Sequence, residues 1–230
     1  MKDIEALAVQ EDEADTATQL LDVAERMLAD QGLERVSLRA IVRASGQSNP
    51  SAAHYHFGTR DALVKALLSR RIRMINVVRH QRLDALEAQG HAKDIHALMK
   101  LTVGVLADVV KGTPWGADYV RVVSQYLFTS EGDDRVDLDR EALSGQARMV
   151  RLMRAALPGM APQVFRDRSW LVNNQIVYSI ARWVHVHGRV TPDNVRRYNA
   201  MVRNLAEFLA SGMAAGQGAS EPIKQEDSGA

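Results

Sequence analysis

Residues 36–61, VSLRAIVRASGQSNPSAAHYHFGTRD, contain two short helical segments separated by a turn. The first segment begins after Ser37, a favoured helix cap, and its apolar residues recur at helical spacing. Gly46 marks its end, because glycine adopts positive φ without steric cost. A second short helix follows, with Ser48 or Asn49 as its predicted cap. Two short helices joined by a glycine-containing turn make a helix-turn-helix.

The second segment has few large apolar side chains, which is unusual for a helix that only packs. Asn and Gln side chains can pair with adenine, and small residues permit close approach to base edges. The hydroxyl of Ser37 and the N–H groups at helix starts can bind phosphate. This segment therefore predicts contacts with DNA. The residues expected to make them are Gln47, Ser48, Asn49, Pro50, Ser51, Ala52 and His54.

Charge is unevenly distributed along the 230 residues, although the net charge is only +1. Residues 1–33 carry nine acidic and two basic side chains, whereas residues 34–82 carry ten basic and two acidic ones. A concentrated basic segment favours a polyanionic partner for that segment. A solvated, arginine-rich helical face explains the same charge equally well, and Arg70, Arg71 and Arg73 are expected to belong to such a face near a domain junction.

Working outward, glycines and prolines recur at intervals that divide the chain into about nine helices, and no useful stretch alternates with period two. The predicted fold class is all-α. The first helix is expected to be capped by Thr16 or Thr18. A long helix is expected to run from Arg60 toward Ala88 after a Thr59 cap, and the last helix to start at Pro192 after a Thr191 cap.

The predicted organisation has two domains and two tails. An acidic tail over 1–14 and a small, polar tail over 215–230 are expected to be disordered. Between them lie a helix-turn-helix domain (15–73) and an effector-binding and dimerisation domain (74–214). The absence of cysteine excludes disulfides and thiolate metal sites, and no signal peptide or membrane span is recognised, so a cytoplasmic protein is expected.

The segment from Thr18 to Leu67 resembles the DNA-binding domain of the TetR family of transcriptional regulators. The matching residues are LDVAE (21–25), GL (32–33), VSLRAI (36–41), ASG (44–46) and YHFGTRDAL (55–63). The resemblance implies a homodimer that binds a palindromic duplex operator, usually as a repressor. It also implies an all-α ligand-binding domain whose last two helices pair across the dimer axis.

By this resemblance, further residues are expected to contact DNA: Ser37 and Arg39 through phosphate, Tyr55 and His56 at the end of the second helix, and Thr59 and Arg60 at the next helix start. His56 is equally well explained as a packing residue. One departure is evident, since the interval from Gly46 to Phe57 is one residue longer than in the commonest family pattern. Residues Asn49 and Pro50 therefore extend either the turn or the recognition helix.

A buried effector pocket is predicted in the second domain. The helix over 169–186 is apolar nearly all round, so both of its sides must be buried. One side is expected to meet the partner subunit together with the last helix, and the other to line a core or a pocket. Asn173, Asn174 and Gln175 would bond across the dimer or to a ligand. The expected ligand is a mostly apolar small molecule, without metal or cofactor. Residues expected to line its pocket are Trp115, Tyr119, Tyr126, Met149, Met153, Trp170, Asn174 and Tyr178.

Two other function classes compete with a DNA-binding regulator. An enzyme is disfavoured, because no metalloprotease, nucleophile-elbow or phosphate-loop motif occurs. The acidic run 131–139 lacks a glycine at the sixth position, where a calcium loop requires one, and is expected to be a solvated loop. An architectural DNA-binding protein without an effector remains the second alternative.

Overall fold

A computed structural model describes residues 3–4, 15–129 and 140–216. Within these residues the fold is all-α, with nine main helices and no strand, as the sequence predicts. The helices are α2 (Thr16–Gln31), α3 (Leu38–Ala44), α4 (Ala52–Phe57), α5 (Arg60–Ala88), α6 (Ile95–Gly112), α7 (Gly116–Thr129), α8 (Ser144–Ala156), α9 (Pro162–His187) and α10 (Val195–Ala214).

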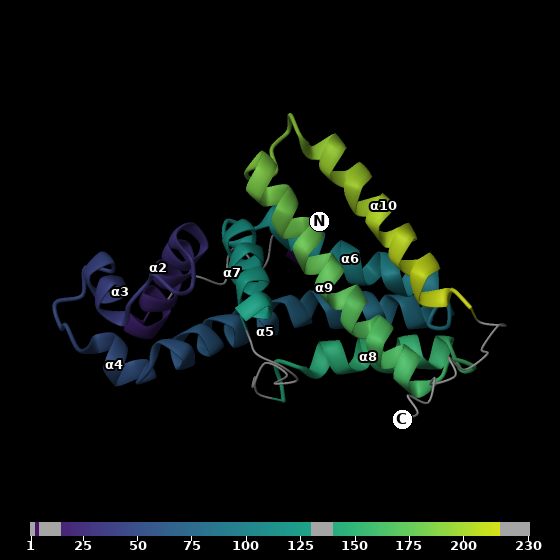
Figure 1. Cartoon of the computed structure of the whole chain (residues 1–230), viewed down its shortest axis with the longest axis horizontal. Helices are drawn as coiled ribbons and strands as arrows, with labels where there is room; N and C mark the ends of the chain where they lie inside the picture. Colours follow the sequence, from purple (N-terminus) through teal and green to yellow (C-terminus); the bar gives the residue numbers. More distant parts are fainter. Residues whose placement is uncertain (1–2, 5–14, 130–139, 217–230) are drawn as a thin grey trace, which may run out of the picture.

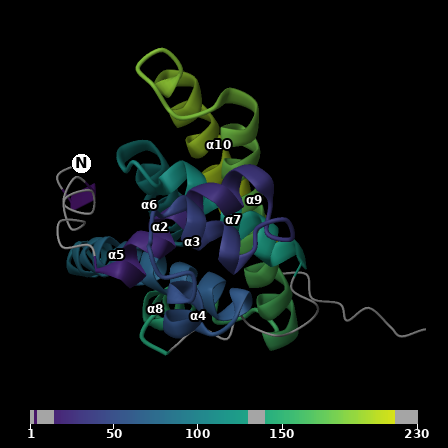
Figure 2. The same ribbon diagram turned by 90° about the vertical axis from the view of Figure 1, so that its left-hand side faces the viewer.

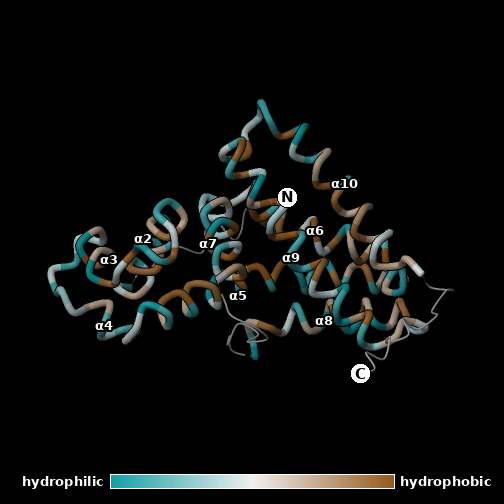
Figure 3. The backbone as a smooth tube through the Cα atoms, in the orientation of Figure 1, coloured by the Kyte–Doolittle hydropathy of each residue, from teal (hydrophilic) through white to brown (hydrophobic). Residues whose placement is uncertain are grey.

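Helices α2, α3 and α4 gather at one pole of an elongated molecule, and α6 to α10 form the larger body (Figure 1). The 29-residue helix α5 runs from the pole into the body, so the domain boundary expected at residues 73 and 74 falls inside one continuous helix. Apolar residues concentrate along the middle of α5 and along α6 (Figure 3), where the surrounding helices pack. The two parts are therefore joined by a rigid element and not by a linker.

Most helix starts follow from capping chemistry. Ser37 and Thr59 accept hydrogen bonds from backbone N–H groups three residues ahead, at 3.2 Å and 3.1 Å, and cap α3 and α5 as predicted. The cap of α2 is instead Asp15, whose carboxylate accepts from the N–H of Thr18 at 2.8 Å. An ionised carboxylate is a stronger acceptor there than a threonine hydroxyl, and it also favours the positive helix end.

The start of the last helix was also predicted wrongly. Residues 192–194 form a turn, and α10 begins at Val195. The side chain of Asn194 accepts from the N–H of Thr191 at 2.8 Å and donates to the carbonyl of Arg189 at 3.1 Å. These bonds stabilise a turn in place of the first helical turn, because a short amide side chain can satisfy the local backbone by itself.

Two glycines inside helices allow close helix contacts. A Cβ on Gly116 would lie 2.4 Å from the carbonyl oxygen of Val109, where α7 meets α6. A Cβ on Gly145 would lie 2.3 Å from Oδ1 of Asn76, where α8 meets α5. Both glycines therefore serve packing and not helix termination. Gly212, in contrast, lies inside α10. The recurrence of glycines along the chain predicts a helix end at Gly212, and that prediction was wrong.

The predicted tails lie almost entirely outside the described residues, as does the acidic run 131–139. Ile4 is an exception, since it is buried at 3% exposure beside Gly112 at the end of α6. At the other end, Ala215 and Gly216 are described, and Arg168 of α9 donates to the carbonyl of Met213 at 3.0 Å. No described helix has the length and apolar character needed to cross a membrane.

Candidate nucleic-acid interface

Helices α3 and α4 and their connecting turn lie at the pole farthest from α10 (Figures 1 and 2). Helix α4 begins only at Ala52, so Asn49 and Pro50 belong to the turn and not to the helix. The Asn49 side chain accepts from the N–H of Ser51 at 2.9 Å, and its carbonyl accepts from the N–H of Ala52 at 3.1 Å. The extra residue therefore lengthens the turn, because Asn49 and not a helical bond satisfies this backbone.

Ala52, one of the predicted DNA contacts, is buried, so it faces the core and not the outer surface of α4. Ala52 and Ala53 are 5% and 0% exposed and form the inner face of α4, against the core. Their small side chains allow this short helix to approach its neighbours closely. A side chain on the inner face of a helix cannot reach a base edge on the outer side.

The outer surface of the turn and α4 is polar and aromatic. Tyr55 is 84% exposed, and its ring meets that of His56 edge to face at 5.3 Å. An exposed tyrosine without a packing role is a suitable contact for a phosphate or base. The exposed residues of this surface are Ser48, Asn49, Pro50, Ser51, His54, Tyr55 and His56.

Several predicted contact residues have internal roles as well. The hydroxyls of Ser37 and Thr59 are engaged as helix caps. Gln47 donates to Gln19 of α2 at 2.9 Å and fixes the turn against that helix. Arg60 donates to the carbonyl of Leu33 at 3.1 Å and lies 3.8 Å from the carboxylate of Glu34. Together these bonds position the helix-turn-helix.

Arg39, in contrast, is exposed and has no hydrogen bond or ion pair with any residue in the described part of the chain. Arg43, one helical turn further along α3, is exposed in the same way and was not among the predicted DNA contacts. Their spacing of four residues places both side chains on one helix face. This spacing was the available signal, and the pair leaves two exposed guanidinium groups on that face of α3.

Three other basic residues of 34–82 are paired with carboxylates of the described residues. Arg70 pairs with Asp22 at 2.7 Å, and Arg82 pairs with Asp108 at 2.8 Å. Arg71, predicted to be solvated, is 2% exposed and pairs with Glu25 at 2.6 Å. That prediction was wrong because the acidic partners lie in distant segments of the chain.

The Glu25–Arg71 pair joins α2 of the helix-turn-helix to α5. Arg71 donates to both carboxylate oxygens of Glu25, and its guanidinium lies 4.4 Å from the ring centroid of Trp115. Burial raises the pKa of the Glu25 carboxyl to about 7, and the hydrogen bonds and charge of Arg71 offset part of that rise. Asp22 contacts the same guanidinium at 3.1 Å. The orientation of α2 is thereby tied to the body.

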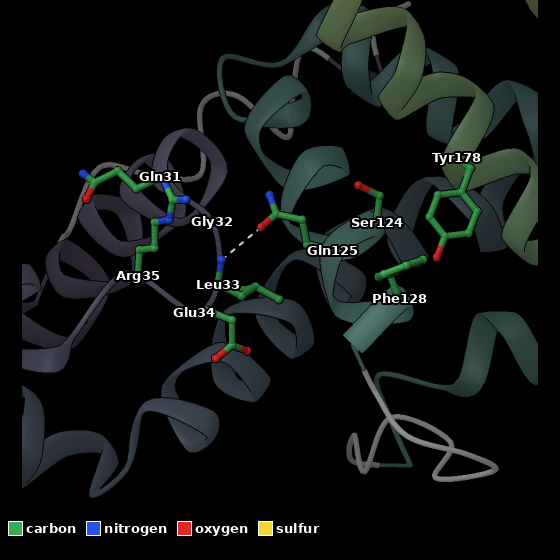
Figure 4. Close-up of a pocket in the computed structure, with 9 residues that line it drawn as sticks. All are labelled: Gln31, Gly32, Leu33, Glu34, Arg35, Ser124, Gln125, Phe128 and Tyr178. Carbon is green, nitrogen blue, oxygen red and sulfur yellow. Dashed lines mark hydrogen bonds between the residues drawn. The ribbon is translucent and has the colours of Figure 1, made fainter.

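A second set of contacts joins the end of α2 to α7. Arg121 pairs with Asp30 at 2.9 Å, and the Gln125 side chain accepts from the N–H of Leu33 at 3.0 Å (Figure 4). An open pocket of about 420 Å³ lies along this junction, with Phe128 and Tyr178 on its α7–α9 side. Its lining residues are Gln31, Gly32, Leu33, Glu34, Arg35, Ser124, Gln125, Phe128 and Tyr178.

The residues predicted to bind an effector are not gathered in this pocket, since only Tyr178 lines it. Trp170, also predicted to line the effector pocket, is 67% exposed on α9 and lies in no described cavity. Tyr126, Asn174 and Tyr178 are half-buried. The buried members of the set are Trp115, Tyr119, Met149 and Met153. No group of three or more potential metal ligands occurs in residues 3–4, 15–129 and 140–216.

Comparison with known proteins identifies the helix-turn-helix. Residues 20–67 match the family model described as bacterial regulatory proteins, tetR family, which confirms the resemblance predicted for this segment. No curated protein matches the sequence significantly. Among solved structures, the chain is similar to NalD, the secondary repressor of the MexAB-OprM multidrug efflux pump in Pseudomonas aeruginosa. The identity is 18%, the TM-score is 0.46, and the alignment covers 86% of this chain and 93% of NalD.

Proposed function

We propose that this chain, which carries the DNA-binding domain of the tetR family of bacterial regulatory proteins, is a sequence-specific transcriptional regulator. In this proposal it acts in the cytoplasm as a repressor that a small molecule releases from its operator. The observation that carries the proposal is the exposed polar surface of the turn and α4 beside two unpaired arginines of α3.

Each part of this surface has a distinct task. Arg39 and Arg43 neutralise phosphates and set affinity, because phosphate contacts dominate binding and its dependence on salt. Asn49, Ser51 and Tyr55 face outward beside them and read base edges or anchor the backbone. The caps at Ser37 and Thr59 keep α3 and α5 in place beside the turn. The division predicts different effects of mutation for the two groups.

A homodimer through α9 and α10 presents this surface twice. Trp170 and Leu171 of α9 are 67% and 55% exposed, and Phe208 of α10 is 67% exposed. These side chains lie near the same end of the helix pair, because Arg168 of α9 bonds to Met213 of α10. Exposed apolar side chains of this size favour a protein interface. Two recognition surfaces then meet half-sites roughly 34–36 Å apart.

Effector control requires two dimer geometries with different affinities for DNA. The contacts from α2 to α5 and α7 supply a mechanical link, since they connect the helix-turn-helix to the body on two sides. An effector that favours a body conformation in which the half-sites no longer match weakens binding. The buried aromatic and methionine side chains around α7 and α8 offer it an apolar environment.

Fluorescence anisotropy with labelled duplexes from the DNA flanking the gene tests this proposal. Arg39→Ala should weaken binding to all sequences alike and lower the slope of log K against log salt by about one. Asn49→Ala should relax base preference at a cost of roughly 1–3 kcal/mol. Because Asn49 also bonds to Ser51, circular dichroism must first show that the variant is folded.

Arg151→Ala is the matched control, because Arg151 is an exposed arginine of α8 in the body. It should leave both the salt slope and the base preference unchanged. If neither Arg39→Ala nor Asn49→Ala changes DNA binding, the assignment of this surface as the DNA contact is wrong. If the wild-type chain binds no duplex even at low salt, the proposed function itself is wrong.

A further inference from the structure

The connection between α2 and α3 faces α7 and α9 across the open pocket of about 420 Å³ (Figure 4). Residues 31–35 form one wall and belong to the helix-turn-helix, whereas residues of α7 and α9 form the other and belong to the body. A hydrogen bond joins the two walls, from the N–H of Leu33 to Oε1 of Gln125 at 3.0 Å. A molecule bound in this pocket therefore contacts both parts of the chain.

The body side of the pocket carries two aromatic rings. Phe128 is 82% exposed, although a ring of this size is normally buried against other apolar groups. Tyr178 is half-buried, and its hydroxyl has no hydrogen-bond partner among the residues that the structure describes. Burial raises the pKa of Tyr178, so the hydroxyl keeps its proton at neutral pH and can donate. This side thus offers apolar ring surface and one available donor.

The opposite wall is held in place by hydrogen bonds. The N–H of Gly32 donates to the carbonyl of Leu28 at 3.0 Å, and Arg60 donates to the carbonyl of Leu33 at 3.1 Å. Leu33 is 8% exposed and packs in the core. A Cβ on Gly32 would lie 3.6 Å from Oε1 of Gln125, so the missing side chain leaves space between the walls. A wall fixed in this way is preformed, as small-molecule sites usually are.

The charged groups at the rim of the pocket balance each other. Glu34 and Arg35 are adjacent, opposite in charge and exposed. The Glu34 carboxylate also lies 3.8 Å from the Arg60 guanidinium. The lining residues of α7 and α9 carry no charge. Neither an anion nor a cation is therefore favoured, because a charged group would lose hydration in this pocket without gaining a matched partner.

We propose that this pocket binds a neutral, planar aromatic molecule and that binding lowers the affinity of the chain for its operator. The inference rests on the proposed regulator function and adds a site at the junction to the apolar environment proposed for the effector around α7 and α8. Aromatic rings of the ligand pack against Phe128, Tyr178 and Leu33. A carbonyl oxygen of the ligand accepts from the Tyr178 hydroxyl. The volume of about 420 Å³ suits a molecule of roughly two to four fused rings.

The position of the pocket explains how a ligand there affects DNA binding. Leu33 lies only four residues before Ser37, whose hydroxyl caps α3. A ligand between this connection and α7 changes the orientation of the helix-turn-helix relative to the body. The two recognition surfaces of a dimer then no longer match successive half-sites. By thermodynamic linkage, operator DNA lowers the affinity for the ligand by the same factor.

Nile red is the probe for this pocket, because it is a neutral planar dye with a ring carbonyl and its fluorescence rises in apolar surroundings. The purified full chain should bind Nile red saturably. Flavone, which is also neutral and aromatic and carries a carbonyl, should displace the dye. Octanoate, an aliphatic anion, should not displace it at the same concentration.

Three variants locate the bound dye. Phe128→Ser removes an exposed ring and should weaken Nile red binding about fivefold or more. Tyr178→Phe keeps the ring and removes only the hydroxyl, so it should weaken binding about two- to tenfold. Val77→Ser is the matched control at an exposed apolar position of α5 outside the pocket, and it should leave binding unchanged.

Anisotropy with duplexes from the DNA flanking the gene separates this inference from the proposed function. Saturating Nile red should lower the affinity for duplex about fivefold or more, and Phe128→Ser should reduce that effect. The inference is overturned by undiminished dye binding in folded Phe128→Ser or Tyr178→Phe, by displacement with octanoate as readily as with flavone, or by unchanged duplex affinity in saturating dye. The regulator function fails separately, if the chain without dye binds no duplex.

Discussion

Replacing Arg71 by methionine tests the link between α2 and α5. The substitution keeps the length of the side chain but leaves the Glu25 carboxylate buried without its bidentate partner, at 2% exposure for the whole residue. At pH 8, above the pKa of about 7 for Glu25, that carboxyl is charged in the wild type. Removing one partner of a buried ion pair costs about 3–5 kcal/mol. Loss of the Trp115 contact adds about 1 kcal/mol.

Urea unfolding followed by circular dichroism measures this loss. With a slope of about 3 kcal/mol per molar urea, a total loss of about 4–6 kcal/mol should lower the midpoint by about 1.3 to 2 M at pH 8. Without Arg71, the pKa of Glu25 rises further, so its carboxyl takes up a proton at pH values where the wild type is ionised. The difference in the free energy of unfolding between the wild type and Arg71→Met should therefore shrink by up to about 1.4 kcal/mol on going from pH 8 to pH 7.

Two matched variants make the result specific. Arg70→Met removes the neighbouring arginine, whose side chain is 19% exposed and pairs with the less buried Asp22, and it should cost about 1 kcal/mol or less. Glu25→Leu combined with Arg71→Met removes both charges and should recover most of the loss. If the double variant is as unstable as Arg71→Met alone, the buried pair is not the source of the effect and the reasoning is refuted.

Three further predictions concern packing, assembly and phosphate contact. Gly116→Ala should lower the free energy of unfolding by about 1–3 kcal/mol, because its Cβ would meet the Val109 carbonyl oxygen at 2.4 Å. Gly104→Ala, whose Cβ would have nothing within 4 Å, should leave the free energy of unfolding unchanged or raise it. Phe208→Glu should convert a dimer to monomer in light scattering, while Val77→Glu, an exposed change on α5, should not. Arg43→Ala should lower the salt slope of DNA binding by about one in anisotropy titrations, and an unchanged slope would exclude Arg43 from the interface.

Local chemistry made much of the fold predictable. The helix ends at Gly32, Gly58 and Gly188 coincide with positive φ. Glycine favours such a conformation whatever its neighbours are, so these ends could be predicted from single residues. The caps at Ser37 and Thr59 are equally local. The all-α class and the helix-turn-helix follow from such signals, because they depend on residues only a few positions apart.

Long-range pairing was not predictable in the same way. Arg71 and Glu25 are separated by 46 positions, and only the packing of α2 on α5 brings them together. Likewise, the sequence left open whether Asn49 and Pro50 extend the turn or the helix, and the bond from Ser51 to Asn49 favours the turn. That shift places Ala52 on the inner face of α4, where the pattern of small residues had suggested a base contact.

The most direct test of the central claim is selection of binding sites from a random duplex library by the purified full chain. The account predicts enrichment of one two-fold symmetric sequence, bound by a dimer, with half-sites about one helical turn apart or a multiple of it. The enrichment should depend on Asn49 and on the exposed surface of α4. Recovery of unenriched, unsymmetric DNA by a folded chain at low salt would contradict it.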